Sequence, residues 1–281
     1  VVMGVVPARA AGVQRIAVCG PPGREGDLKP VVLGACRLAG AALVYRMGGA
    51  QAIAALAYGT ESVTPVDVIV GPGNLYVQEA KRQVSGQVGI DGFAGPSDLV
   101  LIAGSDADPG PLALDLLAQA EHGAGTLVIG ISSSTDVLDR LGGLIESAPD
   151  TGAVARLVGA RDAEQALALA HALAPEHLQL VGHEIESLAP RATRAGCVFV
   201  GPAAGAAFGD YIAGSSHILP TGGAARFASG LTPSHFRRRF AEVRIPASAA
   251  AELARAAAPV ARAEGFELHA RSMEARIRDN D

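Results

Sequence analysis

The sequence predicts an α/β fold with two Rossmann-like parallel-sheet modules and a small helical arm at the C-terminus. Over most of the 281 residues, short apolar segments typical of strands alternate with segments typical of helices. This alternation is the pattern of βαβ units on a parallel sheet. It restarts after Gly95-Pro96-Ser97 and becomes helical from about Leu231. We therefore expect three parts, residues 1–97, 98–230 and 231–281.

The first module alternates strands and helices three times. We expect strands at residues 15–20, 42–47 and 66–70, and helices at 27–39, 51–58 and from 75 to about 83. A Pro-Pro-Gly loop follows the first strand, and Gly59 closes the second helix. Loops of this composition end regular elements because proline and glycine disfavour the continuation of a strand or a helix.

The second module repeats the alternation. We expect strands at residues 99–103, 127–131, 178–181 and 197–200, and helices at 112–121, 136–147 and 163–173. The helical arm ends in a long charged segment, residues 249–278. We find no internal repeat and expect no disordered linker.

Charge and cysteine content exclude several classes of protein. The 23 basic and 28 acidic residues give a net charge of −5, and nucleic-acid binding needs clustered cations. The one dense basic stretch, residues 237–239, is expected to be a solvated helix end. No uncharged apolar run reaches the ~18 residues of a membrane span. Three dispersed cysteines, Cys19, Cys36 and Cys197, fit buried packing positions in a reducing, cytoplasmic protein.

A glycine-containing turn follows the third predicted strand. Gly71-Pro72-Gly73-Asn74 lies between that strand and a helix, where open α/β sheets bind ligands and a helix N-terminus favours phosphate. Tyr76 stands where a dinucleotide fingerprint has its third glycine. The turn alone therefore fits either a dinucleotide site or an ordinary tight turn.

Two other motifs carry side chains with chemical function. Gln119 and His122 lie three apart at the end of a predicted helix and so on one face, which fits a shared metal or a polar helix end. The adjacent Glu176 and His177 precede a predicted strand. They fit proton-transfer groups with pKa values near neutrality, or an exposed polar pair.

Two acid–histidine combinations follow later in the chain. Asp210 and His217 lie in one glycine-flanked loop, residues 209–217, which favours a ligand site over a turn. Glu264 and His269 lie in the C-terminal arm, where solvated side chains are the simpler reading unless other ligands are near.

The order of these motifs carries more information than any one of them. Seven blocks follow one another along the chain: GGAQAIAALAYGTESV (48–63), VDVIVGPGNLYVQEAKRQVSG (66–86), AGPSDL (94–99), AQAEHG (118–123), APEHLQL (174–180), GDYIAGSSHILPTGGAARFASGL (209–231) and EGFELHARSMEAR (264–276). This series closely resembles the histidinol dehydrogenase family over essentially the whole chain. The resemblance implies oxidation of L-histidinol to L-histidine in two hydride transfers to NAD⁺ through an aldehyde, the last step of histidine biosynthesis.

The resemblance also implies a zinc site and a homodimer. It assigns residues 1–97 to NAD binding, 98–230 to catalysis and 231–281 to dimerisation. One zinc ion per subunit would be held by Gln119, His122, Asp210 and His269. In the family His269 and Glu264 are contributed across the dimer interface.

Further roles follow from the same resemblance. His177 would remove the hydroxyl proton, and Glu176 would activate water at the aldehyde stage. The implied substrate contacts are Ser97, His177, His217, Glu264 and the zinc ligands, and the implied NAD contacts are Gln51 and Asn74. Because Glu264 and His269 are five apart, they do not share one face of a regular helix, so a bend at Gly265 is expected.

Two alternatives stay open, and so does the start of the chain. The sequence begins Val1-Val2-Met3, and we expect a missing N-terminal segment that holds part of the catalytic module. Relatives of the family act on other small polyols, so a different polyol substrate is one alternative. A non-catalytic zinc-binding paralogue is the other.

Overall fold

The computed structural model describes residues 1–93 and 95–277, in two compact units, Val1–Arg237 and Arg238 onward. All ladders between the described strands are parallel, and helices alternate with them, which confirms the predicted α/β class. The second unit begins at Arg238, later than the predicted start of the arm at residue 231. Residues 94 and 278–281, which the motif AGPSDL and the predicted arm include, lie outside the described residues.

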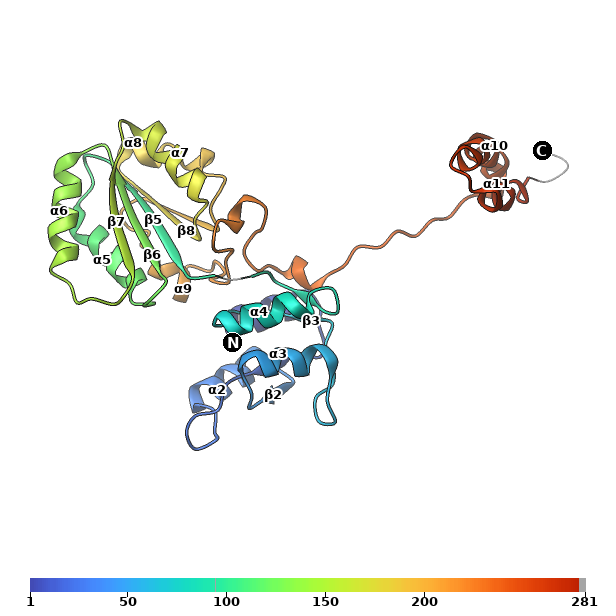
Figure 1. The fold of residues 1–281 in the computed structure, drawn as a ribbon, viewed down its shortest axis with the longest axis horizontal. Helices are drawn as coiled ribbons and strands as arrows, with labels where there is room; N and C mark the ends of the chain where they lie inside the picture. The colour runs from blue at the N-terminus through green and yellow to red at the C-terminus, as the bar shows by residue number, and fades with distance from the viewer. Residues whose placement is uncertain (94, 278–281) are drawn as a thin grey trace. The chain divides into compact units, whose positions relative to one another are not determined.

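The first module contains short strands and longer helices (Figure 1). Its elements are α1 (Val2–Ala10), β1 (Ala17–Cys19), α2 (Pro30–Ala39), β2 (Leu43–Tyr45), α3 (Gly49–Tyr58), β3 (Val68–Ile69), α4 (Leu75–Val84) and β4 (Gly89–Ile90). The strands form two separate pairs, β1–β2 and β3–β4. All three predicted strands and all three predicted helices are present, whereas α1 and β4 were not predicted. A buried cluster that includes Ile53, Leu56 and Ile69 joins α3 to β3.

The second module is a five-stranded sheet in the order β7-β6-β5-β8-β9 (Figure 1). The strands are β5 (Asp98–Ala103), β6 (Leu127–Ser132), β7 (Val154–Gly159), β8 (His177–Val181) and β9 (Cys197–Val200). Strand β5 is central, because the chain runs outward through β6 and β7 and then returns to its other side. The edge strand β7 was not predicted, since its exposed Arg156 and glycine end interrupt the apolar run.

Helices cover both faces of this sheet. Helices α5 (Pro109–Ala120) and α6 (Thr135–Glu146) pack on one face, and α7 (Ala163–Leu173) and the short α8 (His183–Glu186) on the other. Helix α5 begins one turn before its predicted start because Pro109 occupies its first turn and the Asp108 side chain accepts the Gly110 N–H.

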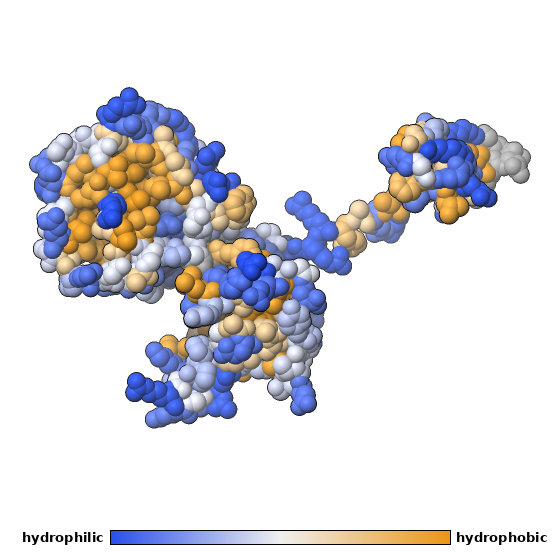
Figure 2. All heavy atoms as spheres, in the orientation of Figure 1, coloured by the Kyte–Doolittle hydropathy of each residue, from blue (hydrophilic) through white to orange (hydrophobic). Residues whose placement is uncertain are grey.

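The α7 face of the sheet is covered less completely than the α5 face. Helix α7 lies against β5 and β6, whereas β7 leaves Val154 41 % exposed and Val158 half-buried on the same face. Figure 2 shows an apolar surface over this part of the sheet. No described helix is both long and apolar enough to cross a membrane.

The amino ends of the strands carry the polar groups of the module. Ser97 precedes Asp98, the first residue of β5, and Glu176 precedes His177, the first residue of β8. Leu99 pairs with His177, so these two starts lie side by side. Helix α5 runs antiparallel to β5, and its C-terminal end reaches the same edge of the sheet.

The second unit is a pair of helices, α10 (Ala247–Ala263) and α11 (Glu267–Glu274). Ala258, Ala261 and Ala270 form its small core. Gly265, at φ +82°, separates the two helices, which confirms the expected bend. Arg262 pairs with Glu267 and Glu274 across the bend.

One expectation for the region before α10 is wrong. The chain is not helical from residue 231, since a short 3₁₀ turn, Pro233–Phe236, is the only described helical piece there before Ala247. The basic stretch 237–239 is exposed and follows this 3₁₀ turn, with Arg237 as its C-cap, so it ends a 3₁₀ turn and not an α-helix. The Arg237 guanidinium also donates hydrogen bonds to the carbonyl oxygens of Ala10 and Ala11, at the end of α1. Cations favour this position because the last carbonyls of a helix lack partners.

Candidate active site

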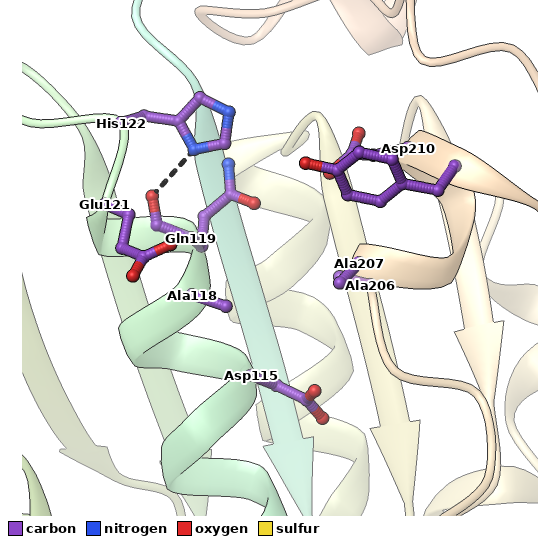
Figure 3. Close-up of a pocket in the computed structure, with 9 residues that line it drawn as sticks. Asp115, Ala118, Gln119, Glu121, His122, Ala206, Ala207 and Asp210 are labelled. Carbon is purple, nitrogen blue, oxygen red and sulfur yellow. Dashed lines mark hydrogen bonds between the residues drawn. The ribbon is translucent and has the colours of Figure 1, made fainter.

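A pocket of about 210 Å³ lies between the last turns of α5 and the short helix α9 (Ala207–Tyr211) (Figure 3). The residues that line it are Asp115, Ala118, Gln119, Glu121, His122, Ala206, Ala207, Asp210 and Tyr211. Three of the predicted metal ligands, Gln119, His122 and Asp210, are therefore brought together from two distant parts of the chain.

Gln119 and His122 are oriented by the end of α5. The His122 Nδ1 lies 3.0 Å from the Gln119 carbonyl oxygen, and donation to that oxygen leaves Nε2 free to bind a ligand. The buried Gln119 side chain donates through Nε2 to the Ser97 hydroxyl at 2.5 Å, so its amide oxygen stays available. Figure 3 shows both side chains at the helix end.

Asp210 faces them from α9, across the pocket (Figure 3). The preceding Gly209 is buried against Phe199 of β9, and a Cβ atom there would come within 2.7 Å of the phenyl ring. Gly205 is equally close to the Asp115 carboxylate. Glycine at these two positions lets α9 lie close to the sheet and to α5, and thereby places Asp210 opposite Gln119.

The pocket suits a cation. Its three predicted ligands are an amide, an imidazole and a carboxylate, and imidazole and carboxylate are common zinc ligands. The C-terminal end of α5 carries partial negative charge from unpaired carbonyl groups. The described residues contain no group of three or more His, Cys, Asp or Glu positioned to hold a metal.

Glu176 and His177 are buried at the start of β8, with 6 % and 3 % exposure. The alternative of an exposed polar pair is therefore wrong. The Glu176 carboxylate accepts the Ser97 hydroxyl at 2.5 Å and the Asp98 N–H at 3.2 Å. His177 donates through Nδ1 to the Asp98 carbonyl oxygen at 3.1 Å, which leaves Nε2 as a proton acceptor.

Burial shifts the pKa values of both groups. It raises the pKa of Glu176 to about 7, against the opposing effect of the Ser97 hydrogen bond. It lowers the pKa of His177, although the Asp98 hydrogen bond opposes this. A neutral imidazole next to a carboxyl group that titrates near neutrality is suited to general acid–base chemistry.

Asp98 is a functional candidate that the sequence analysis missed. Its carboxylate accepts the Glu176 N–H at 2.6 Å, and its own carbonyl oxygen holds His177. Burial raises the pKa of Asp98 to about 6. The signal in the sequence was an acidic residue directly before the apolar strand 99–103, where a carboxylate needs a partner.

Ser97 joins the two parts of the site. Its hydroxyl accepts a hydrogen bond from the Gln119 amide and donates one to the Glu176 carboxylate. A chain of hydrogen bonds therefore connects the pocket that holds the potential metal ligands to the acid–base pair. Asp115, which lines the pocket, accepts a hydrogen bond of 2.7 Å from the amide of the fully buried Gln179. The Gln179 oxygen is buried without a partner among the described residues.

The other predicted site residues lie elsewhere. His217 is exposed in its loop and does not line the pocket. Gln51 lies in the first turn of α3, and Asn74 caps α4 by accepting the Val77 N–H at 3.1 Å; both are exposed. Glu264 is the C-cap residue directly after α10 and His269 lies in α11, both exposed in the second unit.

The fold and the pocket define an α/β protein in which a buried acid–base pair is hydrogen-bonded, through Ser97, to a pocket lined by potential metal ligands. A family model described as histidinol dehydrogenase matches residues 1–277, and the chain belongs to that family. The histidinol dehydrogenase of Agrobacterium fabrum is 44 % identical over 288 residues, which span 99 % of this chain and 66 % of that protein. That of Deinococcus radiodurans is 45 % identical over 285 residues, spanning 97 % and 65 %.

A solved structure agrees with this assignment. The crystal structure of histidinol dehydrogenase from Elizabethkingia anophelis matches with a TM-score of 0.91 and 33 % identity, over 98 % of this chain and 66 % of that one. The chain thus spans slightly less than two thirds of the length of these three relatives.

Proposed function

We propose that the protein oxidises L-histidinol to L-histidine with NAD⁺, in two hydride transfers through the aldehyde, as the last step of histidine biosynthesis. The observation that carries the proposal is the hydrogen-bonded chain from Gln119 through Ser97 to Glu176, in a member of the histidinol dehydrogenase family. It connects a group of potential metal ligands to a buried acid–base pair.

His177 is the base in this proposal. Its pKa is lowered by burial, so the ring is neutral at neutral pH and Nε2 can accept the substrate hydroxyl proton while hydride leaves for NAD⁺. The hydrogen bond from Nδ1 to Asp98 fixes the tautomer that this role requires.

Glu176 acts in the second half of the reaction. With a pKa of about 7, it exists in both protonation states at neutral pH and can take a proton from the water that adds to the aldehyde. The second hydride transfer then yields the carboxylic acid. Ser97 holds the carboxyl group in place and is a substrate contact.

A zinc ion, one per subunit, would be held by Gln119, His122 and Asp210, with His269 of the partner subunit as the fourth ligand. When bound, zinc would orient the substrate and polarise its hydroxyl oxygen. The donor types in the pocket and the negative end of α5 support this assignment.

The remaining assignments concern substrate, dinucleotide and assembly. His217 and Glu264 are proposed as further substrate contacts, with Glu264 supplied across the interface of a homodimer. Gln51 and Asn74 are proposed as NAD contacts, supported by their places at the starts of α3 and α4, which follow parallel strands. The division at residues 97 and 230 and the cytoplasmic location remain predictions.

The proposal predicts that the full-length gene product, loaded with zinc, forms two NADH per histidinol and releases histidine. NADH absorbance and chromatography of the product measure this, and a chelator should abolish activity until zinc is restored. A protein that retains zinc but forms no NADH from histidinol contradicts the proposal. Faster turnover of a simple diol in a substrate panel would assign a different polyol as substrate.

A further inference from the structure

The most deeply buried charges of the first module lie beside the predicted dinucleotide loop, Gly71–Asn74. Lys81 on α4 pairs with Asp91, with 2.6 Å between Nζ and Oδ1 and side-chain exposures of 1 % and 6 %. Neither residue has a role in the site described above. An ion pair this buried loses the hydration of both charges and is stable only with further polar partners.

Those further partners are the backbone N–H and C=O groups of one residue, Gly71. The Gly71 N–H donates to Asp91 Oδ2 at 2.7 Å, and Lys81 Nζ donates to the Gly71 carbonyl oxygen at 2.5 Å. Gly71 has φ +119°, a conformation that favours glycine. The ion pair therefore holds both the N–H and the C=O of Gly71, the second residue after the end of β3.

A second contact fixes the next part of the loop. Gln78, one helical turn before Lys81, donates through Nε2 to the Gly73 carbonyl oxygen at 3.2 Å. A Cβ atom on Gly73 would lie only 2.4 Å from the Val77 side chain, so the loop presses directly on α4. Two carbonyl oxygens of the loop are thus bonded to donors from α4 and do not face an anion.

We propose that Lys81 and Asp91 are positioning residues for the dinucleotide: they clamp Gly71 and so set the conformation in which Gly73 and Asn74 are presented to it. This inference rests on the proposed function. Lys81 does not bind the phosphates itself, because its ammonium group is buried and paired. The clamp acts on dinucleotide affinity and not on the chemistry at Glu176 and His177.

The physical argument separates positioning from simple stabilisation. Replacing a buried ion pair by apolar residues of similar volume is often neutral or stabilising, whereas removing one partner leaves a buried charge and is strongly destabilising. A double apolar replacement should therefore preserve the fold while it removes the two bonds to Gly71.

The test compares the double variant K81M/D91L with a control on the same helix. In the control, R82Q/E79Q, the exposed pair Arg82–Glu79 of α4 is removed. For K81M/D91L we expect a folded protein whose melting temperature falls by no more than a few degrees, because the Gly71 N–H and C=O lose their partners. We expect its KM for NAD⁺ to rise about tenfold or more. The kcat and the KM for histidinol should stay near wild type, and the control should match wild type throughout.

Hydrogen exchange of the Gly71 amide and calorimetric titration with NAD⁺ provide readouts that do not need turnover. We expect the amide to lose protection in K81M/D91L and the NAD⁺ affinity to fall in parallel. A stable double variant with unchanged NAD⁺ affinity overturns the clamp, and so does wild-type protein that binds no NAD⁺. If NAD⁺ binds but histidinol is not oxidised, the proposed function fails while the titration still decides the clamp.

Discussion

Glu176 is held in a position where its ionisation opposes folding. Burial raises its pKa from the ordinary value of 4.5 to about 7, so the folded protein binds this proton more tightly than the unfolded chain does. Stability from this group is therefore complete below pH 4.5 and is lost as the pH rises towards 7. A carboxyl group that destabilises the fold at neutral pH is typical of a functional site.

The variant E176Q should separate function from stability. Glutamine stays neutral, so E176Q avoids the cost of ionising this buried group. The free energy of unfolding of metal-free E176Q, measured relative to wild type, should therefore be about 2 kcal/mol higher at pH 8 than at pH 5. Its NADH formation should fall by about 10²-fold or more. Urea unfolding at the two pH values and steady-state kinetics measure both effects. An equal stability difference at pH 5 and pH 8 would show that the raised pKa is wrong.

At the scale of elements, α9 places Asp210 only because Gly209 allows a close approach to β9. The variant G209A should push α9 away from Phe199, whose ring is buried and lies 5.9 Å from the His177 ring. We expect zinc affinity to fall about tenfold or more while the fold is retained. Zinc titration and circular dichroism measure these two quantities.

The matched control for this substitution is G143A in α6. A Cβ atom on Gly143 meets nothing within 4 Å, and alanine is the better helix former, so zinc affinity should be unchanged. Equal zinc affinity in G209A and wild type would contradict the role given to α9.

The burial of each strand explains whether it could be predicted from the sequence. Strands β5 and β6 were predicted because they are buried on both faces and consist mainly of apolar residues. Strand β7 was missed because it lies at the edge and exposes Arg156. Helical spacing predicted that Gln119 and His122 lie close together, because they are three residues apart within one turn.

Contacts across elements were beyond the reach of sequence patterns. Asp98 acts on Glu176 through the pairing of β5 with β8, which no local periodicity encodes. Lys81 lies in a polar helical segment, where a lysine side chain is expected to be exposed to solvent. Its burial depends on the ion pair with Asp91, which lies beyond the end of that helix. The resemblance to a family supplied the roles of Asp210 and His269, which spacing alone left open.

At the scale of the whole molecule, the proposed zinc ligands are divided between the two units of the chain. Gln119, His122 and Asp210 belong to the unit that ends at Arg237, and His269 belongs to the unit that begins at Arg238. If His269 is supplied by the partner subunit, a lesion in one unit and a lesion in the other can be separated in a heterodimer.

Mixing two inactive variants tests this division. E176Q and H269A should each be inactive alone, and co-refolding equal amounts should restore about a quarter of wild-type activity, because half of the dimers are then heterodimers with one intact site of two. Mixing E176Q with H122A is the control and should restore nothing, since both lesions lie in the first unit. NADH formation measures recovery. No recovery in the first mixture, despite heterodimers detected by native mass spectrometry, would place His269 in the site of its own chain.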